Sequence, residues 1–167
     1  MWTPTLNKVH TFNGVIAKGT GMFSDMIIPG RDELKEAPKD WPTELQPGTL
    51  NVRIDNDGYP AENNNQWKTE RIPLLDTGII PSCFVIPQDK FVNNSLAPMK
   101  NQPDRGNAQV WRAHLRVVIS RQELLCWVLR RIGSGMQIFL EIVSNLALRD
   151  KYGLQDEQEV LVIMYEA

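Results

Sequence analysis

The sequence has 167 residues, of which 42% are hydrophobic and 23% charged, and its net charge is −2. This length is typical of one domain with its own core, so we expect a single domain over residues 1–167. The composition excludes a disordered chain, and no apolar run approaches the roughly 20 residues that cross a bilayer. Two cysteines without CxxC spacing, and a start without a signal-peptide pattern, favour a reduced, cytoplasmic protein.

Positive charge is concentrated in the last third of the chain. Residues 105–149 contain seven arginines, no lysine and two glutamates, a formal charge of +5, so the rest of the chain carries −7. Arginine without lysine suits bidentate recognition of phosphate or carboxylate, although a solvated helix face has the same composition. The slightly acidic total makes a general nucleic-acid binder unexpected.

The chain up to residue 107 is expected to form short strands separated by polar loops. Strict alternation over residues 50–54 is the pattern of a half-buried strand, and Pro38 and Pro42 limit any helix that begins at Arg31. The expected elements are strands over 9–16, 50–54 and 78–87, a helix over 31–36, and polar loops over 55–70 and 88–107.

Two helices are expected in the last third. Ser120 and Glu123 have the spacing of a capping box, and the apolar stripe that follows predicts a helix ended by Gly133. That stripe consists of Leu124, Leu125, Val128 and Leu129. Asn145 is placed to cap a short helix that ends at Gly153. Strands are expected over 136–143 and 159–164.

This order of elements indicates a mainly β fold with short helices. It lacks the regular alternation of strands and helices that defines a doubly wound sheet. A small mixed or antiparallel barrel with inserted helices fits the order better.

Residues 47–54, Pro-Gly-Thr-Leu-Asn-Val-Arg-Ile, form the most informative motif. In a strand, Thr49, Asn51 and Arg53 share one face. A hydroxyl and an amide carbonyl side by side can complete the shell of a magnesium ion whose charge is mostly balanced by substrate phosphates. A polar outer face on an edge strand has the same pattern.

Two further segments can carry chemistry. Gly19 and Gly21 follow an apolar strand, where glycines let phosphate approach backbone amides, although a hairpin turn has the same pattern. Glu141 lies in an apolar strand, where it either faces solvent, accepts a hydrogen bond from a ligand hydroxyl or acts as a general base. His10 and His114 are isolated, so neither a zinc site nor a Ser-His-Asp triad is expected.

In chain order, these pieces resemble the archaeal-type, CTP-dependent riboflavin kinases. The resemblance rests on the Gly-Val-Ile strand leading to Gly19, on Gly-Thr-Leu-Asn at 48–51, and on Leu-Glu-Ile-Val at 140–143 followed by Leu-Arg-Asp-Lys-Tyr-Gly-Leu at 148–154. It implies a six-stranded cradle-loop β-barrel. It also implies magnesium-dependent transfer of a phosphoryl group from CTP to the terminal hydroxyl of riboflavin, which gives FMN.

The resemblance further implies roles for individual residues. Thr49 and Asn51 would bind the magnesium ion, and Glu141 would contact the flavin substrate and orient or deprotonate its hydroxyl. Ser134 neighbours Gly133, which stands where the family has threonine, and would lie in the same site. The nucleotide would be held by Gly19, Thr20, Gly21, Met22, Phe23, Ser24, Leu146, Ala147, Leu148 and Arg149. Riboflavin and CTP would be the partners, with no nucleic acid and no membrane.

Departures from the family leave other functions open. Met22 and Phe23 replace more polar, glycine-rich residues, and Glu-Gln-Glu at 157–159 replaces Asp-Gly-Asp. Residues 88–107 and 117–131 are interpreted as insertions. The alternatives are a non-catalytic barrel that binds a nucleotide, a flavin or DNA, a kinase for another hydroxylated acceptor, and a flavin oxidoreductase.

Overall fold

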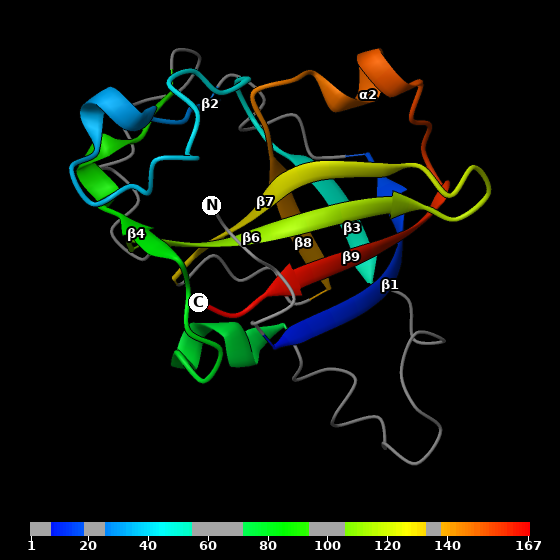
Figure 1. The fold of residues 1–167 in the computed structure, drawn as a ribbon, viewed down its shortest axis with the longest axis horizontal. Helices are drawn as coiled ribbons and strands as arrows, with labels where there is room; N and C mark the ends of the chain where they lie inside the picture. Colours follow the sequence, from blue (N-terminus) through cyan, green and yellow to red (C-terminus); the bar gives the residue numbers. More distant parts are fainter. Residues whose placement is uncertain (1–7, 19–25, 55–71, 94–105, 133–137) are drawn as a thin grey trace.

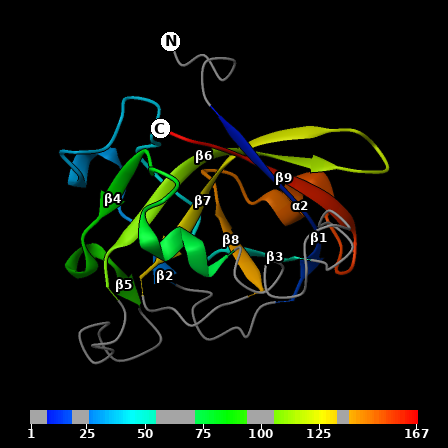
Figure 2. The same ribbon diagram turned by 90° about the horizontal axis from the view of Figure 1, so that it is seen from below.

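The computed structural model describes residues 8–18, 26–54, 72–93, 106–132 and 138–167. Six strands form a closed antiparallel barrel in the order β6, β7, β8, β3, β1, β9, and β9 pairs back onto β6 (Figures 1 and 2). They are β1 Val9–Ala17, β3 Leu50–Ile54, β6 Ala108–Val117, β7 Glu123–Arg131, β8 Phe139–Val143 and β9 Glu159–Tyr165. The expected mainly β fold with a six-stranded barrel is confirmed. Within the described ranges, no helix is long and apolar enough to span a membrane.

Alternate residues of each strand fill the barrel interior. Val52 of β3 is fully buried and pairs with Ile16 of β1 and Leu140 of β8, which confirms the half-buried strand expected over 50–54. Cys126 of β7 belongs to the same interior, and burial raises the pKa of its thiol to about 12. The polar side chains of β3 therefore lie on the outer face of the barrel.

The prediction of a helix after Ser120 is wrong, because residues 123–131 form strand β7. Its inward side chains include Leu124, Cys126 and Val128, and its outward side chains Trp127 and Leu129 are buried in a second cluster. A strand buried on both faces loses its alternation and looks like a continuous apolar run. At the β6–β7 turn, the Gln122 amide donates to Ser120 Oγ at 3.3 Å, in place of a helix cap. The stretch 117–131 is thus no insertion, since it supplies a barrel strand.

Several short elements also differ from the expected ones. The helix expected over 31–36 is a single 3-10 turn, and the strand expected over 78–87 shrinks to three residues. The expected loop over 88–107 contains a 3-10 turn and a strand that pairs with β2. The bounds are β2 Met26–Ile27, η2 Arg31–Glu33, η4 Pro73–Thr77, β4 Phe84–Ile86, η5 Gln88–Lys90 and β5 Val92–Asn93. The loop expected over 55–70 lies outside the described residues.

The helix α2, Leu148–Tyr152, forms near the expected place but begins differently. Ala147 occupies the N-cap position, so the expected cap by Asn145 is wrong. Upstream of the helix, Ser144 Oγ accepts a hydrogen bond from the Leu146 amide at 3.0 Å. Gly153 ends the helix with φ 62°, as expected for a residue in the left-handed region.

A second hydrophobic cluster covers the outer face of β4, β6 and β7. Trp41, Phe84 and Trp127 pack edge to face, with the Trp41 ring centroid 4.9 Å and 5.0 Å from the other two. The fully buried Trp41 also donates its indole N–H to the Pro29 carbonyl at 3.0 Å. Residues 28–45 are therefore tied to the barrel wall, beside β4 in Figure 1.

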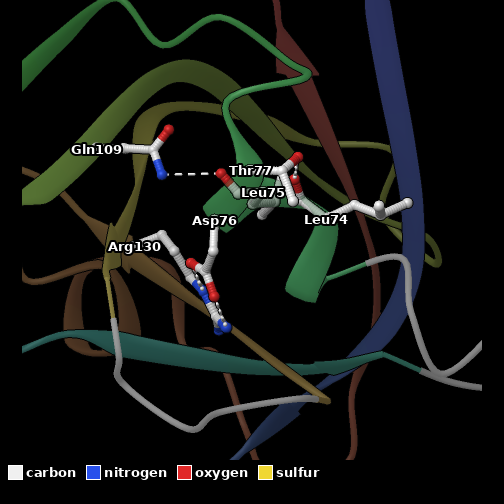
Figure 3. A network of polar contacts seen from close by, with 6 residues as sticks. All are labelled: Leu74, Leu75, Asp76, Thr77, Gln109 and Arg130. Atoms are coloured by element: carbon white, nitrogen blue, oxygen red, sulfur yellow. Dashed lines mark hydrogen bonds and ion pairs between the residues drawn. The ribbon is translucent and has the colours of Figure 1, made fainter. Parts of the chain in front are cut away.

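The 3-10 turn η4 closes one end of the barrel through buried polar contacts (Figure 3). Leu75 is fully buried in the main core, and its carbonyl accepts a hydrogen bond from the Gln109 side chain at 2.8 Å. Asp76 accepts two hydrogen bonds from Arg130, each at 3.0 Å, and the Arg130 side chain is only 5% exposed. Two inward-facing polar residues of β6 and β7 are thus satisfied by one short segment.

The arginines of the positive segment are largely engaged inside the molecule. Four of them, Arg112, Arg116, Arg130 and Arg149, pair with the carboxylates of Asp40, Glu123, Asp76 and Asp156. Arg131 is buried, donates to the Gly106 carbonyl and lies 4.8 Å from the centre of the Phe91 ring. Four of the seven arginines in this segment are therefore balanced by carboxylates of the same chain, and Arg105 lies outside the described residues.

The Asp40–Arg112 pair should give stability that depends on pH. The hydrogen bond from Arg112 lowers the pKa of Asp40 below its ordinary value of 3.8. The pair therefore stabilises the fold fully above pH 3.8, and its contribution is lost as the pH falls through the lowered pKa. In urea unfolding at pH 7, Asp40→Asn should lower the free energy of unfolding by about 1 kcal/mol or less, because the pair is partly exposed.

The control for this prediction is Asp32→Asn, which changes an exposed carboxylate on η2 by the same charge. It should leave the free energy of unfolding near that of the wild type, both at pH 7 and below the lowered pKa of Asp40. A difference between wild type and Asp40→Asn that persists undiminished below the lowered pKa would contradict the assigned role.

Candidate functional site

The site expected around Thr49, Asn51 and Glu141 is assembled on the outer face of two neighbouring strands. In the β3–β8 register, Asn51 lies directly opposite Glu141. Because Val52 and Leu140 point inward, this pair points outward. β3 is flanked by β1 and β8, so the alternative of an edge strand is wrong.

Three side-chain oxygens converge at this point. Thr49 Oγ1 lies 3.4 Å from Asn51 Oδ1 and 3.3 Å from Glu141 Oε1. All three side chains are partly buried, so none is a fully solvated surface group. Both contacts are longer than the roughly 2.7–2.8 Å that is typical of a hydroxyl hydrogen bond, so both are weak.

Apolar residues flank the three oxygens across the sheet. The strand registers define a row that runs from Ala17 of β1 through Asn51 and Glu141 to Leu129 of β7. Ala17 is 5% exposed and Leu129 is 1% exposed. Partial exclusion of water on both sides strengthens electrostatic interactions at the oxygens.

A pocket of about 180 Å³ includes Thr49 in its lining, whereas Asn51 and Glu141 do not line it. One wall is the turn over residues 46–50, in which Gly48 has φ 76°, and the other comprises the end of β8 and the start of α2. The backbone N–H of Gln46 donates a hydrogen bond to the Ser144 carbonyl at 2.9 Å, and this bond holds the two walls together. The pocket includes four of the residues expected to hold a nucleotide, namely Leu146, Ala147, Leu148 and Arg149.

Arg149 supplies a positive charge at this pocket. Its Nη1 donates to Asp156 Oδ1 at 2.7 Å, and its Nη2 donates to the Ala17 carbonyl at 3.4 Å. Ala17 ends strand β1, so Arg149 connects α2 to the segment that leads into the expected nucleotide loop. The loop residues Gly19, Thr20, Gly21, Met22, Phe23 and Ser24, and also Ser134, lie outside the described residues.

The donor set suits a hard divalent cation. Magnesium takes oxygen ligands at about 2.0–2.1 Å in octahedral geometry, which places adjacent ligands about 2.9 Å apart. The observed separations of 3.3 and 3.4 Å need only a small contraction. In the described part of the chain, no three histidine, cysteine or acidic side chains gather in one place.

Two residues of the pocket wall, Gln46 and Ser144, lie outside every motif that the sequence analysis singled out. Gln46 precedes the Pro-Gly turn, and this adjacency was the only signal available for it. Ser144 becomes part of the site through its backbone, which no side-chain pattern reveals.

No protein-family model matches the sequence, and no curated protein matches it. The motif resemblance, the fold and the geometry of the site are therefore the basis for a functional proposal.

Proposed function

We propose that this protein is a magnesium-dependent kinase that transfers a phosphoryl group from CTP to the terminal ribityl hydroxyl of riboflavin. The observation that carries the proposal is the convergence of Thr49, Asn51 and Glu141, of which Thr49 also lines the pocket that contains Arg149. Oxygen donors for a metal, a cation for phosphates and a carboxylate for an acceptor hydroxyl are the groups that such a reaction needs.

Each group has a distinct role in the proposed reaction. Thr49 and Asn51 hold the magnesium ion, which when bound neutralises charge on the nucleotide phosphates. Residues 146–149 and the segment 19–24 bind CTP. The acceptor hydroxyl oxygen attacks the γ-phosphorus, the bond to the bridging oxygen breaks to release CDP, and the hydroxyl proton passes to Glu141. FMN is the second product.

The reaction requires little further chemistry from the protein. Phosphoryl transfer is catalysed mainly by positioning the reactants and by stabilising the charge that develops on the transferred group. This activity therefore requires neither a protein nucleophile nor a catalytic triad. The resemblance to the archaeal-type riboflavin kinases also implies that the barrel is of the cradle-loop type, and this assignment is part of the proposal.

The internal pairing of the arginines favours the kinase over a DNA-binding regulator. Arg112, Arg116 and Arg130 each contact a carboxylate of the same chain, away from the pocket that contains Arg149. A surface that binds DNA needs cations that can neutralise phosphates along a groove. Pairing of these side chains within the fold reduces the positive potential available for that purpose.

The proposal is tested by ligand binding and by turnover. Calorimetry with CTP, ATP, riboflavin and FMN, each with and without magnesium, should show magnesium-dependent binding of CTP and binding of the flavin. Incubation with CTP and riboflavin should form FMN, measured by chromatography with fluorescence detection. Absence of nucleotide binding under every condition would refute the proposal, and salt-sensitive binding of duplex DNA would favour the regulator instead.

A further inference from the structure

Glu141 comes close to the expected metal ligands although it lies 92 residues along the chain from Thr49. Thr49 Oγ1 is 3.3 Å from Glu141 Oε1, and Asn51 is the residue directly opposite Glu141 in the β3–β8 register. Directly opposite side chains on one face of a sheet have Cβ atoms about 5 Å apart. Two strands therefore present a hydroxyl, an amide and a carboxylate to one point.

The charge of this donor set depends on Glu141. Thr49 and Asn51 are neutral, and a hydroxyl and an amide do not compensate the charge of a divalent cation. Magnesium in proteins is usually held by one or two carboxylates together with substrate phosphates. Glu141 is the carboxylate that the structure joins to this pair by a hydrogen bond.

We infer that Glu141 is the charged ligand of a divalent-cation site formed together with Thr49 and Asn51. The inference rests on the proposed function and deepens it, since the resemblance assigns Glu141 to the acceptor substrate alone. A carboxylate has two oxygens, so one can ligate the cation while the other faces the acceptor hydroxyl. Glu141 would then align the acceptor with the phosphates that share the cation.

The surroundings of Glu141 support this role. Leu129, opposite Glu141 on β7, is 1% exposed, and Ala17, opposite Asn51 on β1, is 5% exposed. A carboxylate beside such neighbours is partly shielded from water, so a cation compensates its charge more effectively than at an open surface.

The test measures binding of Mn²⁺ alone to the full chain, by the loss of the free Mn²⁺ signal in electron paramagnetic resonance. Glu141→Gln keeps the shape of the side chain and removes its charge, and it should weaken Mn²⁺ binding at least about tenfold. Glu141→Asp keeps the charge and should recover part of the affinity. Glu123→Gln is the matched control, because it makes the same change of charge at the β6–β7 turn, about 20 Å along β7 from Leu129.

The expected result is that Glu123→Gln binds Mn²⁺ within about twofold of the wild type and that Thr49→Ala and Asn51→Ala also weaken binding. Equal binding by wild type and Glu141→Gln, or no binding by the wild type at millimolar Mn²⁺, would overturn the inference. Calorimetry with CDP, once with magnesium and once with a chelator, separates the two proposals. CDP binding in either condition supports the nucleotide site whatever the Mn²⁺ result, and its absence in both conditions refutes the proposed function.

Discussion

Asn51→Ala should lower turnover of CTP and riboflavin by at least about a hundredfold while leaving the fold intact. The Asn51 side chain lies on the outer face of β3 and is only partly buried, so its truncation removes no atoms from the barrel interior. It does remove one of the two neutral oxygens expected to hold the cation. Turnover is measured as FMN formation, and the fold is checked by circular dichroism and thermal unfolding.

The control for this variant is Asn13→Ala on β1. Asn13 is exposed and pairs with Leu161 of β9, on a different part of the barrel wall. The same chemical change at that position should leave turnover near that of the wild type. Full activity of a folded Asn51→Ala protein would show that the assignment of Asn51 to the metal is wrong.

Asp76→Ala should destabilise the protein by about 3 kcal/mol, measured by urea unfolding at pH 7. Arg130 is 5% exposed and donates two hydrogen bonds to Asp76, so removing this carboxylate takes a counter-charge and two charge-assisted hydrogen bonds from a buried guanidinium. Loss of the partner of a buried charge costs far more than loss of an exposed pair, because the remaining charge keeps its desolvation penalty.

Two further variants separate burial from charge pairing in general. Asp156→Ala breaks the pair with Arg149, whose side chains are 39% and 49% exposed, and should cost about 1 kcal/mol or less. Combining Asp76→Leu with Arg130→Met should recover much of the stability lost in Asp76→Ala, since both charges of this pair are then removed. Equal costs for Asp76→Ala and Asp156→Ala would contradict the assigned burial of Arg130.

Local sequence patterns were sufficient for the half-buried strands and insufficient for the doubly buried one. Strand β3 has strict alternation because one face lines the interior and the other carries polar residues. Strand β7 packs on the main core through one face and on the Trp41 cluster through the other, so its period is hidden. Residues near β7 in the sequence do not reveal that a distant segment covers Trp127 and Leu129. The capping-box pattern at the turn therefore favoured a helix.

Local sequence likewise predicts one part of the site, the Thr49–Asn51 pair, but not the approach of Glu141 to it. The two-residue spacing of Thr49 and Asn51 predicts that they share a face, and the structure agrees. The approach of Glu141 to that pair depends on the pairing of β3 with β8 across 92 residues. No periodicity in either segment specifies that pairing, so only the resemblance placed Glu141 in the same site.

The position of β9 between β1 and β6 has a consequence for how the chain acquires its shape during synthesis. β9 follows all other barrel strands in the chain, yet it pairs with both β1 and β6. Until β9 leaves the ribosome, those two strands present unpaired backbone edges, which favour association with other chains. We therefore expect a chaperone to be needed chiefly in the interval before β9 emerges. The strands of the site, β3 and β8, have already been synthesised by then.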